Sequence, residues 1–450
     1  MSQITITDVQ NDKGALQFVL SGSHGYGLDK SVANAIRRTL LNDIPTVAFE
    51  TSEDIGPKER DLTMVTNNSP LHNEMLAHRV SLVPLYLDPY LFRKHYFFEC
   101  HVKHESPEPF RFITANDLNI YPLVKDLRDR IDDLRDEAIE SEAGEDSDLN
   151  EILATNSSDN YDLNKPLTQK DKDEILRPYE FRGNTTYCLL NELKQTGTEG
   201  VYQEVHFFGS PSVKTAKNDS RYQAVSQAAY SFVKDDEMVQ QALDAKLALQ
   251  KVPEEEVETF TRKFMLGESA RYFKRDAFNE PYQYLFKVKS VHYWSSEDLF
   301  KKALDILMES CESMKQEFLK ILQEKASAIT LDVKDEYSIV YTLNNQSHTM
   351  GNMLQNHLVR RTIQKSDSSS NSKDGEPSKD SLILSCGYKK PHPLEDSLKL
   401  FVSVNPHQEY IKKAESHKYP EMVSAYLMDQ LEALKQELKD IYDVATKTLV

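Results

Sequence analysis

Three side chains of the kinds that bind zinc lie close together near residue 100. They are Cys100, His101 and His104, within the stretch YFFECHVKH. Thiolate and imidazole groups are common zinc ligands, but a structural zinc site uses four of them. Only three candidates are present here, and the alternation of a β-strand over residues 96–104 explains them without a metal. We therefore expect neither a metal ion nor another cofactor in this chain.

A glycine-containing loop, SHGYGL, has the composition of a phosphate-binding loop. Gly22, Gly25 and Gly27 lie just before an expected helix. However, the loop lacks the Lys-Ser/Thr pair of a Walker motif, and its flanking elements do not fit a dinucleotide-binding fingerprint. We interpret the stretch as a loop that leads into a helix.

His78 and Arg79 are side chains that occur in catalytic and phosphate-binding sites. They belong to the stretch TNNSPLHNEMLAHRVSLVPLY, which predicts a short helix that Pro84 ends and that Ser69 or Asn73 could cap. Its expected apolar face consists of Met75, Leu76, Val80 and Val83. As a bare pair, His78 and Arg79 fit a polar helix face or an interface contact better than a catalytic site.

Lys214, Lys217 and Arg221 give the segment GSPSVKTAKNDSRYQ a basic character, with little acid until after Phe232. The chain as a whole is acidic, with a formal net charge of −18. A basic segment in an acidic chain suggests a surface that faces a partner. A plain surface loop explains the same residues, and the residues alone leave both interpretations open.

The composition limits the classes of function. A chain of 450 residues with 39% hydrophobic and 28% charged residues is long enough for several globular domains. Its acidic balance argues against extensive direct contact with DNA. Four scattered cysteines are typical of an intracellular protein rather than a disulfide framework. We expect no secretory signal at the start of the chain and no membrane-spanning segment.

The element best placed to organise these residues is a predicted helix from Leu28 to Pro45, LDKSVANAIRRTLLNDIP. Asp29 and Ser31 can cap its start, and Pro45 cannot continue it. A second helix starting at Thr349, TMGNMLQNHL, repeats its pattern. The residues expected to pack along these two helices are Val32, Ala33, Ile36 and Leu40 in the first and Met350, Gly351, Asn352, Leu354 and Leu358 in the second.

The elements around each helix also repeat. Each half of the chain is expected to contain a strand pair, a short capped helix, an insertion, a strand and a long amphipathic helix. The long helices are expected over residues 299–322, with residues 295–298 as the helix start, and over residues 420–450. The second has Leu434 and Leu438 in its apolar stripe. A half alone would expose an apolar surface, so we expect helices of the two halves to pack together as an intramolecular pseudo-dimer.

The predicted fold class is therefore α+β, with two dimerisation domains in which small antiparallel sheets pack with long helices. The first domain comprises residues 1–50 and 270–325, and residues 51–269 form an inserted, mainly-β domain. The second domain comprises residues 326–450, with a flexible polar loop at 364–380. The insertion contains an acidic, helix-like run near residues 124–175.

Two stretches of the first half, LDKSVANAIRRTLL and NEMLAHRVSLVPLY, resemble the signature segments of α-type assembly subunits of cellular RNA polymerases. They are most similar to the third-largest subunit of eukaryotic polymerase II and its archaeal counterpart. HTMGNMLQNHL and CGYKKPHPLEDSLKLFV, in the second half, resemble the eleventh subunit, the smaller partner in that heterodimer. Such a fusion is similar to the arrangement in polymerases of large cytoplasmic DNA viruses.

The resemblance implies a role as well as a fold. It implies a non-catalytic subunit that nucleates assembly of a DNA-dependent RNA polymerase, with the largest and second-largest subunits and small subunits as partners. The residues that it implies at the partner interface are Asn34, Arg37, Arg38, His78, Arg79, Lys214, Lys217 and Arg221. The two helix faces named above, with Leu434 and Leu438, would join the two halves.

The resemblance also bears on metal binding and on where the protein works. Some family members carry a cysteine-rich zinc or iron–sulfur module, but this chain has only Cys100 and neighbouring histidines in that region. A viral source would place the protein in the virion and the host cytoplasm, with the nucleus as the alternative. A helical adaptor that bridges unrelated partners is the competing function, and an enzyme would need a catalytic constellation that the sequence does not offer.

Overall fold

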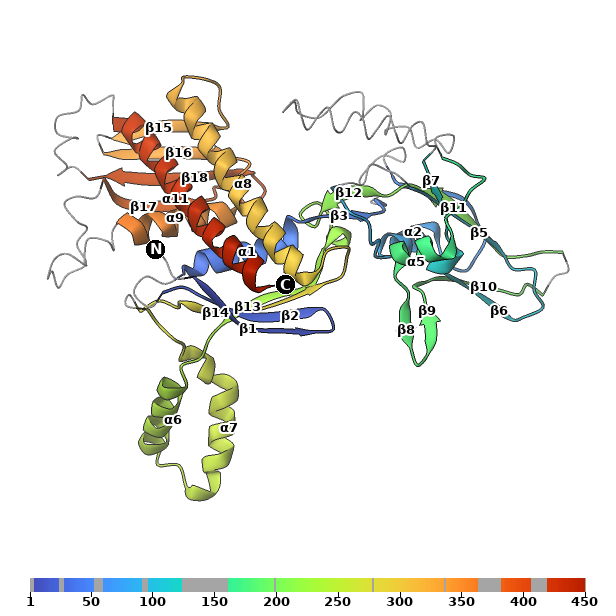
Figure 1. The fold of residues 1–450 in the computed structure, drawn as a ribbon, viewed down its shortest axis with the longest axis horizontal. Coiled ribbons are helices and arrows are strands. Elements are labelled where there is room, and N and C mark those ends of the chain that lie inside the picture. Colours follow the sequence, from blue (N-terminus) through green and yellow to red (C-terminus); the bar gives the residue numbers. More distant parts are fainter. Residues whose placement is uncertain are drawn as a thin grey trace. The chain divides into compact units, whose positions relative to one another are not determined.

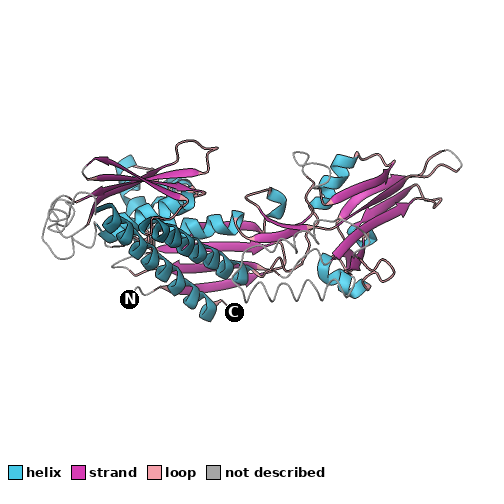
Figure 2. Ribbon diagram, turned by 90° about the horizontal axis from the view of Figure 1, so that it is seen from above, coloured by secondary structure: helices cyan, strands magenta, loops and turns pink. Residues whose placement is uncertain are grey.

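A computed structural model describes residues 4–23, 28–51, 60–90, 96–123, 161–197, 200–276, 279–335, 337–362, 382–405 and 419–449. The fold is mixed α/β, with small antiparallel sheets and helices (Figures 1 and 2). Within the part of the chain that the structure describes, no helix combines the length and apolar character needed to cross a membrane.

The chain divides into two compact units. Unit 1 contains residues 1–43, 226–289 and 296–450, and unit 2 contains residues 44–225 and 290–295. Residues 226–269, which the sequence placed in the inserted domain, belong to unit 1. The reason is that residues 225–232 form a strand of the first sheet.

The first part of unit 1 is a four-stranded antiparallel sheet with two helices. Its elements are β1 (Thr5–Asp12), β2 (Ala15–Ser21), α1 (Lys30–Asn42), β13 (Val225–Phe232), β14 (Gln283–Ser290) and α8 (Ser296–Leu322). The strands lie in the order β1-β2-β14-β13. Between sheet and helix, the ring of Phe18 in β2 stacks on that of Phe286 in β14, and Phe300 of α8 meets both rings edge-on.

The second part of unit 1 has the same succession of elements. They are β15 (Ile329–Asp335), β16 (Ser338–Asn344), α9 (His348–Thr362), β17 (Ile383–Lys389), β18 (Ser397–Val404) and α11 (Tyr419–Thr448). The strand order, β15-β16-β18-β17, matches that of the first sheet position by position. In each half, the short helix follows the second strand, and the half ends in a long helix (Figure 1).

Helix α1 is capped at Asp29 as the sequence predicts, but it is shorter than the predicted stretch from Leu28 to Pro45. The Asp29 carboxylate accepts a hydrogen bond from the backbone N–H of Ser31 at 2.6 Å, and the helix ends at Asn42, three residues before Pro45. Its apolar face is buried, as expected from the four-residue spacing. This face packs against α8 and α9.

The long helices α8 and α11 run side by side (Figures 1 and 2). Their apolar stripes are buried, with Met314, Phe318, Leu434 and Leu438 among the fully covered side chains. At the margin of this contact, Lys315 lies 2.7 Å from Glu432 and Lys435 lies 2.7 Å from Glu312. Exposed ion pairs of this kind add little stability, so apolar burial is the main source of the pairing energy.

A helical hairpin is inserted between β13 and β14. It consists of α6 (Asp236–Gln250) and α7 (Val257–Gly267). The hairpin has a small core of its own, with Val239, Leu243 and Phe264 buried between the helices. This local core explains how the insertion folds without adding to the sheet.

Among its described residues, unit 2 contains short antiparallel strands and the short helices α2 and α5. Its elements are β3 (Pro45–Ala48), β4 (Leu62–Asn67), α2 (Asn73–Ser81), β5 (Tyr96–Lys103), β6 (Phe110–Thr114), β7 (Asn119–Pro122), α5 (Gln169–Leu176), β8 (Tyr179–Phe181), β9 (Asn184–Thr186), β10 (Leu189–Lys194), β11 (Glu204–Gly209) and β12 (Ser212–Thr215). The main sheet has the order β4-β11-β5-β7, and the other strands pair as β10-β6, β12-β3 and β8-β9.

Two details of α2 differ from the sequence prediction. Met75 is 61% exposed, whereas the other three residues expected on the apolar face, Leu76, Val80 and Val83, are buried. Neither Ser69 nor Asn73 caps the helix, since His72 occupies the cap position without a side-chain hydrogen bond. Ser69 instead takes part in a turn, where its hydroxyl donates to the Asn67 carboxamide oxygen at 2.6 Å.

Two predicted segments lie largely outside the described residues. These are the acidic run, of which residues 124–160 are not described, and the polar loop at 364–380. The end of the acidic run is described, and residues 169–176 form α5 as a helix.

Glu317 of α8 stabilises the junction between the two halves of unit 1, and the size of this stabilisation depends on pH. Its carboxylate accepts hydrogen bonds from Lys320, from the backbone N–H of Ala328 and from the Ser327 hydroxyl. The bond from Lys320, followed by the bond from Ala328, lowers the pKa of Glu317 to about 2. A lowered carboxyl pKa stabilises the fold at a pH where the unfolded group is already ionised.

We therefore expect Glu317→Gln to lower the melting temperature at pH 7, where the contribution of the carboxylate is complete. This contribution is lost as the pH falls from the ordinary value of 4.5 towards 2, so the gap to the wild type should narrow. Thermal unfolding between pH 7 and pH 3 measures the gap, with exposed Glu309→Gln on the same helix as a control. A gap that stays constant with pH would contradict the assignment.

Candidate functional site

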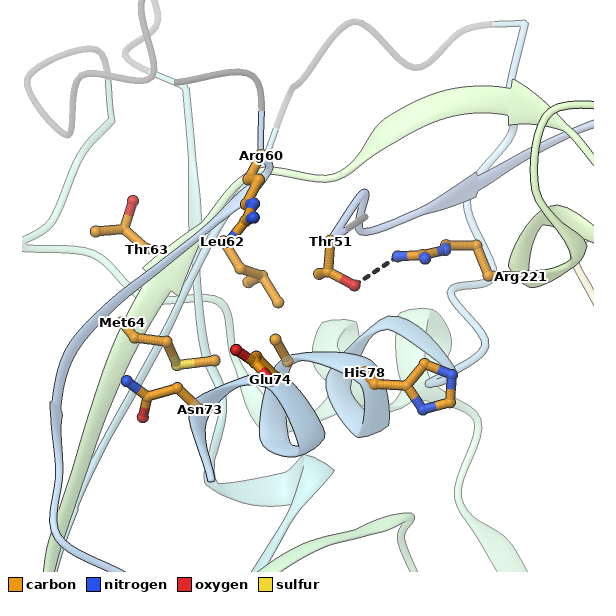
Figure 3. Close-up of a pocket in the computed structure, with 10 residues that line it drawn as sticks. Thr51, Arg60, Leu62, Thr63, Met64, Asn73, Glu74, His78 and Arg221 are labelled. Atoms are coloured by element: carbon orange, nitrogen blue, oxygen red, sulfur yellow. Dashed lines mark hydrogen bonds between the residues drawn. The ribbon is translucent and has the colours of Figure 1, made fainter. Parts of the chain in front are cut away.

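A pocket of 510 Å³ in unit 2 brings together two of the predicted interface residues, His78 and Arg221 (Figure 3). Helix α2 and strand β4 form two of its sides, and Thr51 and Arg221 form another (Figure 3). The lining residues are Thr51, Arg60, Leu62, Thr63, Met64, Asn73, Glu74, Ala77, His78 and Arg221. Cationic, anionic and apolar groups thus share one surface hollow.

Arg221 is held rigidly at the edge of this pocket. Its guanidinium donates hydrogen bonds to the Phe49 carbonyl oxygen at 3.1 Å, to the Thr51 hydroxyl and to the Asp219 carboxylate at 3.0 Å. Only 9% of the Arg221 side chain is exposed. Burial alone would raise the pKa of Asp219, but the hydrogen bonds from Arg221 outweigh it and lower that pKa below its usual value.

Lys214 and Arg221 also surround a buried carboxylate, that of Glu50. Lys214 Nζ lies 3.1 Å from Glu50 Oε2, and Arg221 Nη1 lies 3.6 Å from Glu50 Oε1. A buried carboxylate is costly unless cations and hydrogen bonds compensate it. The two basic residues therefore have a structural task in unit 2, in addition to any contact with a partner.

Arg79 and Lys217, two other predicted interface residues of unit 2, lie outside this pocket lining. Arg79 is exposed on α2 and donates a hydrogen bond to the Leu190 carbonyl oxygen at 3.2 Å. Lys217 is exposed in the turn after β12. His78 is exposed as well, one helical turn from Glu74 (Figure 3). These side chains can meet an acidic partner surface without leaving a buried site.

The other three predicted interface residues belong to α1 in unit 1. Arg37 is half-buried and donates to the Asn34 side-chain oxygen from Nε at 3.0 Å and from Nη2 at 2.8 Å. Arg38 Nε donates to the Thr349 hydroxyl on α9 at 2.8 Å. Arg38 thus connects the two similar helices, whereas the Asn34–Arg37 contact stays within one turn of α1.

The apolar residues predicted to join the two helices are buried in unit 1. Val32, Ala33, Ile36 and Leu40 of α1 are covered, as are Met350, Leu354 and Leu358 of α9. Gly351 of α9 approaches the neighbouring sheet, because a Cβ atom there would lie 2.4 Å from Leu398 Cδ1. Asn34 and Asn352, at matching positions of the two helices, are both partly buried.

A buried ionic cluster accompanies this helix contact. Arg360 of α9 donates to the Asp276 carboxylate at 2.7 Å and to the Asp29 carboxylate at 3.3 Å. The cluster links α9 to the cap of α1 and to the segment before β14. Replacing one partner of such a pair is costly, because the others remain buried without compensation.

Of the three side chains of zinc-binding types, Cys100 and His101 lie in strand β5 and His104 follows it directly. Cys100 is buried, and this burial raises its pKa to about 12. His101, the next residue on the strand, is exposed and lies 2.7 Å from Glu204 Oε1, while His104 Nε2 lies 2.9 Å from the Glu108 carbonyl oxygen. Across the described ranges, no three metal-binding side chains meet in one place.

The sequence missed several residues that build these sites. Arg60, Thr51 and Glu74 line the pocket, and Glu50, Asp276 and Arg360 carry the buried ion pairs. The pattern of charges along the sequence does not predict these ion pairs, because the paired residues are far apart in the chain. The helical spacing of Glu74 and His78 could have placed these two lining residues together.

Comparison with known proteins finds a protein family that matches this chain. The RNA polymerase Rpb3/Rpb11 dimerisation domain matches residues 26–311. The human DNA-directed RNA polymerases I and III subunit RPAC1 is 36% identical over 84 residues, which cover 19% of this chain and 20% of that protein.

Two further relatives come from an archaeon and a social amoeba. The DNA-directed RNA polymerase subunit Rpo3 of Thermoplasma volcanium is 44% identical over 64 residues, covering 14% of this chain and 24% of that protein. The DNA-directed RNA polymerase II subunit rpb3 of Dictyostelium discoideum is 34% identical over 86 residues, covering 19% and 23%. The aligned segments span about a fifth to a quarter of these relatives. Since the family match extends over more than half of the sequence, the chain belongs to the RNA polymerase Rpb3/Rpb11 dimerisation domain family.

Proposed function

We propose that this chain is a non-catalytic assembly subunit of a multisubunit DNA-dependent RNA polymerase. In this role it would hold the largest and second-largest subunits together, with small subunits docking on the same platform. Family membership supports the proposal, as do relatives that are themselves polymerase subunits. The chain would need no cofactor for this task.

The observation that carries the proposal is the repeated architecture of unit 1. Two four-stranded sheets share one strand order, and each is followed by a long helix. Helix α1 packs against α9, and α8 packs against α11, in matching pairs. This arrangement supports an intramolecular pseudo-dimer in which a third-subunit-like half pairs with an eleventh-subunit-like half.

Unit 2 would act as the inserted domain that contacts a large subunit. His78, Arg79 and Lys217 are exposed cations or potential cations on its surface. Arg221 and Lys214 would support this surface through their bonds to Glu50 and Asp219. On α1, Arg37 is the candidate for contact with the second-largest subunit, and Arg38 would position α9 instead.

Fusion of the two halves in one chain favours a polymerase of a large cytoplasmic DNA virus. Such a protein would work in the virion and the host cytoplasm. A cellular nuclear polymerase is the alternative. A helical adaptor that bridges unrelated partners would explain the long helices, but it would not explain two sheets with one strand order.

The proposed contact surface of unit 2 can be tested by charge reversal in the full chain. His78→Glu with Lys217→Glu should weaken binding to the second-largest subunit by about tenfold at physiological salt, because exposed interface charges steer association. Binding is measured by pull-down and by interferometry with the purified subunit. The melting temperature should stay unchanged, since both side chains are exposed.

The matched control is Lys170→Glu, an exposed lysine on α5 of the same unit. It should leave binding at the wild-type level. If the double variant binds as tightly as the wild type, this surface is not the contact. If the wild-type chain does not bind the subunit at all, the assembly role itself is wrong.

A further inference from the structure

The β8–β9 hairpin of unit 2 lies outside the pocket lining described above. Tyr179 pairs with Thr186, Glu180 with Thr185, and Phe181 with Asn184. All six of these residues are exposed. An isolated two-stranded hairpin is only marginally stable in water, so two large aromatic residues on such a hairpin need an explanation.

The aromatic residues occupy one face. Tyr179 is 69% exposed and Phe181 is 54% exposed. Because successive side chains of a strand alternate, these two share a face with Thr186 and Asn184, and Glu180 lies on the opposite face with Thr185. We call the side chains of Tyr179, Phe181, Asn184 and Thr186 the aromatic face.

The hairpin is held in a defined shape at both ends. At its tip, Arg182 and Gly183 have φ of 52° and 79°, the geometry of a tight type I′ turn. At its base, the Arg177 guanidinium lies 4.3 Å from the centre of the Tyr86 ring, and the Tyr187 hydroxyl donates to Asp173 at 2.7 Å. A fixed arm loses little conformational entropy when it binds.

The charges of the arm indicate the chemistry of its partner. The Arg182 guanidinium lies 5.1 Å from the centre of the Phe181 ring, beside the aromatic face. The acid of the hairpin, Glu180, is on the other face. The aromatic face therefore combines apolar rings with a cation, which complements an apolar groove with carboxylates at its rim.

A second exposed aromatic surface shows what distinguishes the hairpin. On the β6–β10 ribbon, Phe110 and Phe112 are also exposed. There, Lys194 Nζ also lies 6.0 Å from the centre of the Phe110 ring. However, Lys194 lies 3.9 Å from Glu192, and Arg111 is paired with Asp117 at 2.7 Å. Each of these two cations of the ribbon therefore has a carboxylate beside it.

We propose that the β8–β9 hairpin is a docking arm whose aromatic face inserts into an apolar, acid-rimmed groove of another polymerase subunit. The identity of the partner as a polymerase subunit rests on the proposed function. Nucleic acid is the less suitable occupant, because one arginine beside two rings neutralises few phosphates and the chain carries a net charge of −18.

The test uses the full chain within its purified complex. The photoreactive amino acid p-benzoylphenylalanine replaces Phe181 in one sample and Thr185, on the opposite face, in another. We expect an adduct with a single polypeptide from position 181, at least about fivefold stronger than from position 185, because only the aromatic face is covered.

Affinity for the polypeptide found in this way is then measured. Tyr179→Thr with Phe181→Thr should weaken it by about tenfold or more, since buried aromatic anchors dominate interface energy. Threonine keeps the strand propensity, so the melting temperature should not change. Glu180→Thr, on the opposite face, is the matched control and should bind as the wild type does.

The outcomes separate this inference from the proposed function. Adducts with RNA or DNA, equal adducts from both faces, or no adduct in a complex that retains both large subunits would overturn the docking arm alone. A purified complex without the large subunits would overturn the proposed function, and with it the assignment of the partner.

Discussion

Replacing Ile36 by aspartate is expected to abolish the packing of α1 in unit 1. Ile36 is 0% exposed, on the face of α1 that packs against α8 and α9. An aspartate at this position would bury an ionised carboxyl group without a partner. Such a group either costs several kcal/mol or forces the local structure open. We expect a loss of at least about 4 kcal/mol in the free energy of unfolding of unit 1.

Urea unfolding followed by circular dichroism measures this loss, and hydrogen exchange assigns it to α1 and α9. Ile36→Val removes one methylene from the same site and should cost only about 1 kcal/mol. If Ile36→Asp leaves exchange in α1 and α9 as slow as in the wild type, these helices are not packed as described.

Replacing Gly209 by alanine is expected to disrupt unit 2. Gly209 is the last residue of β11 and pairs with Leu62 of β4. A Cβ atom at Gly209 would lie 1.8 Å from the Asp61 carbonyl oxygen, which is backbone and cannot rotate away. We expect a loss of about 3 kcal/mol or more, because overpacking against a paired strand displaces the strand.

The effect of Gly209→Ala should extend to the pocket. The Asp61 carboxylate accepts hydrogen bonds from the Glu50 backbone N–H at 2.7 Å and from the Ser212 hydroxyl at 2.6 Å. Displacing Asp61 therefore disturbs Glu50 and the cations around it, and binding at this surface should weaken together with stability.

Thermal and urea unfolding measure the loss for Gly209→Ala. The matched control is Gly197→Ala in the same unit, where an added Cβ meets no atom within 4 Å. This control should change stability by less than about 0.5 kcal/mol. A Gly209→Ala variant as stable as the control would show that β4 and β11 are not paired in this register.

Local sequence patterns predicted the helices of unit 1 well. The cap at Asp29, the four-residue apolar spacing and Pro45 are all read within one short stretch, and α1 follows them. The echo at Thr349 likewise lies in a helix, α9. The strand pair β15 and β16 was predicted because its alternation is also local.

Long-range pairing was harder to predict. Residues 225–232 were assigned to the inserted domain, whereas they form strand β13 of the first sheet, and only pairing with distant strands places them there. The same error misplaced the boundary of the insertion, since the α6–α7 hairpin is inserted between two strands of the first sheet. Met75 was assigned to the wrong face because nine helical residues define a face poorly.

The interface residues show a similar limit. Sequence and resemblance predicted Arg38, Lys214 and Arg221 as partner contacts, and the structure gives each of them an intramolecular bond as well. Their partners, Thr349 and Glu50, lie far away in the chain. Residue spacing within a short stretch cannot reveal such distant pairs. The fold is therefore needed to tell which cations stabilise the chain itself and which are available to a partner.

Purification of the tagged full chain from its native source, with quantitative mass spectrometry of what remains bound, tests the central claim most directly. The account predicts one copy of this chain with one copy each of two very large polymerase subunits, retained through size-exclusion chromatography. Recovery of the chain as a free monomer, or with unrelated partners in place of these subunits, would contradict it.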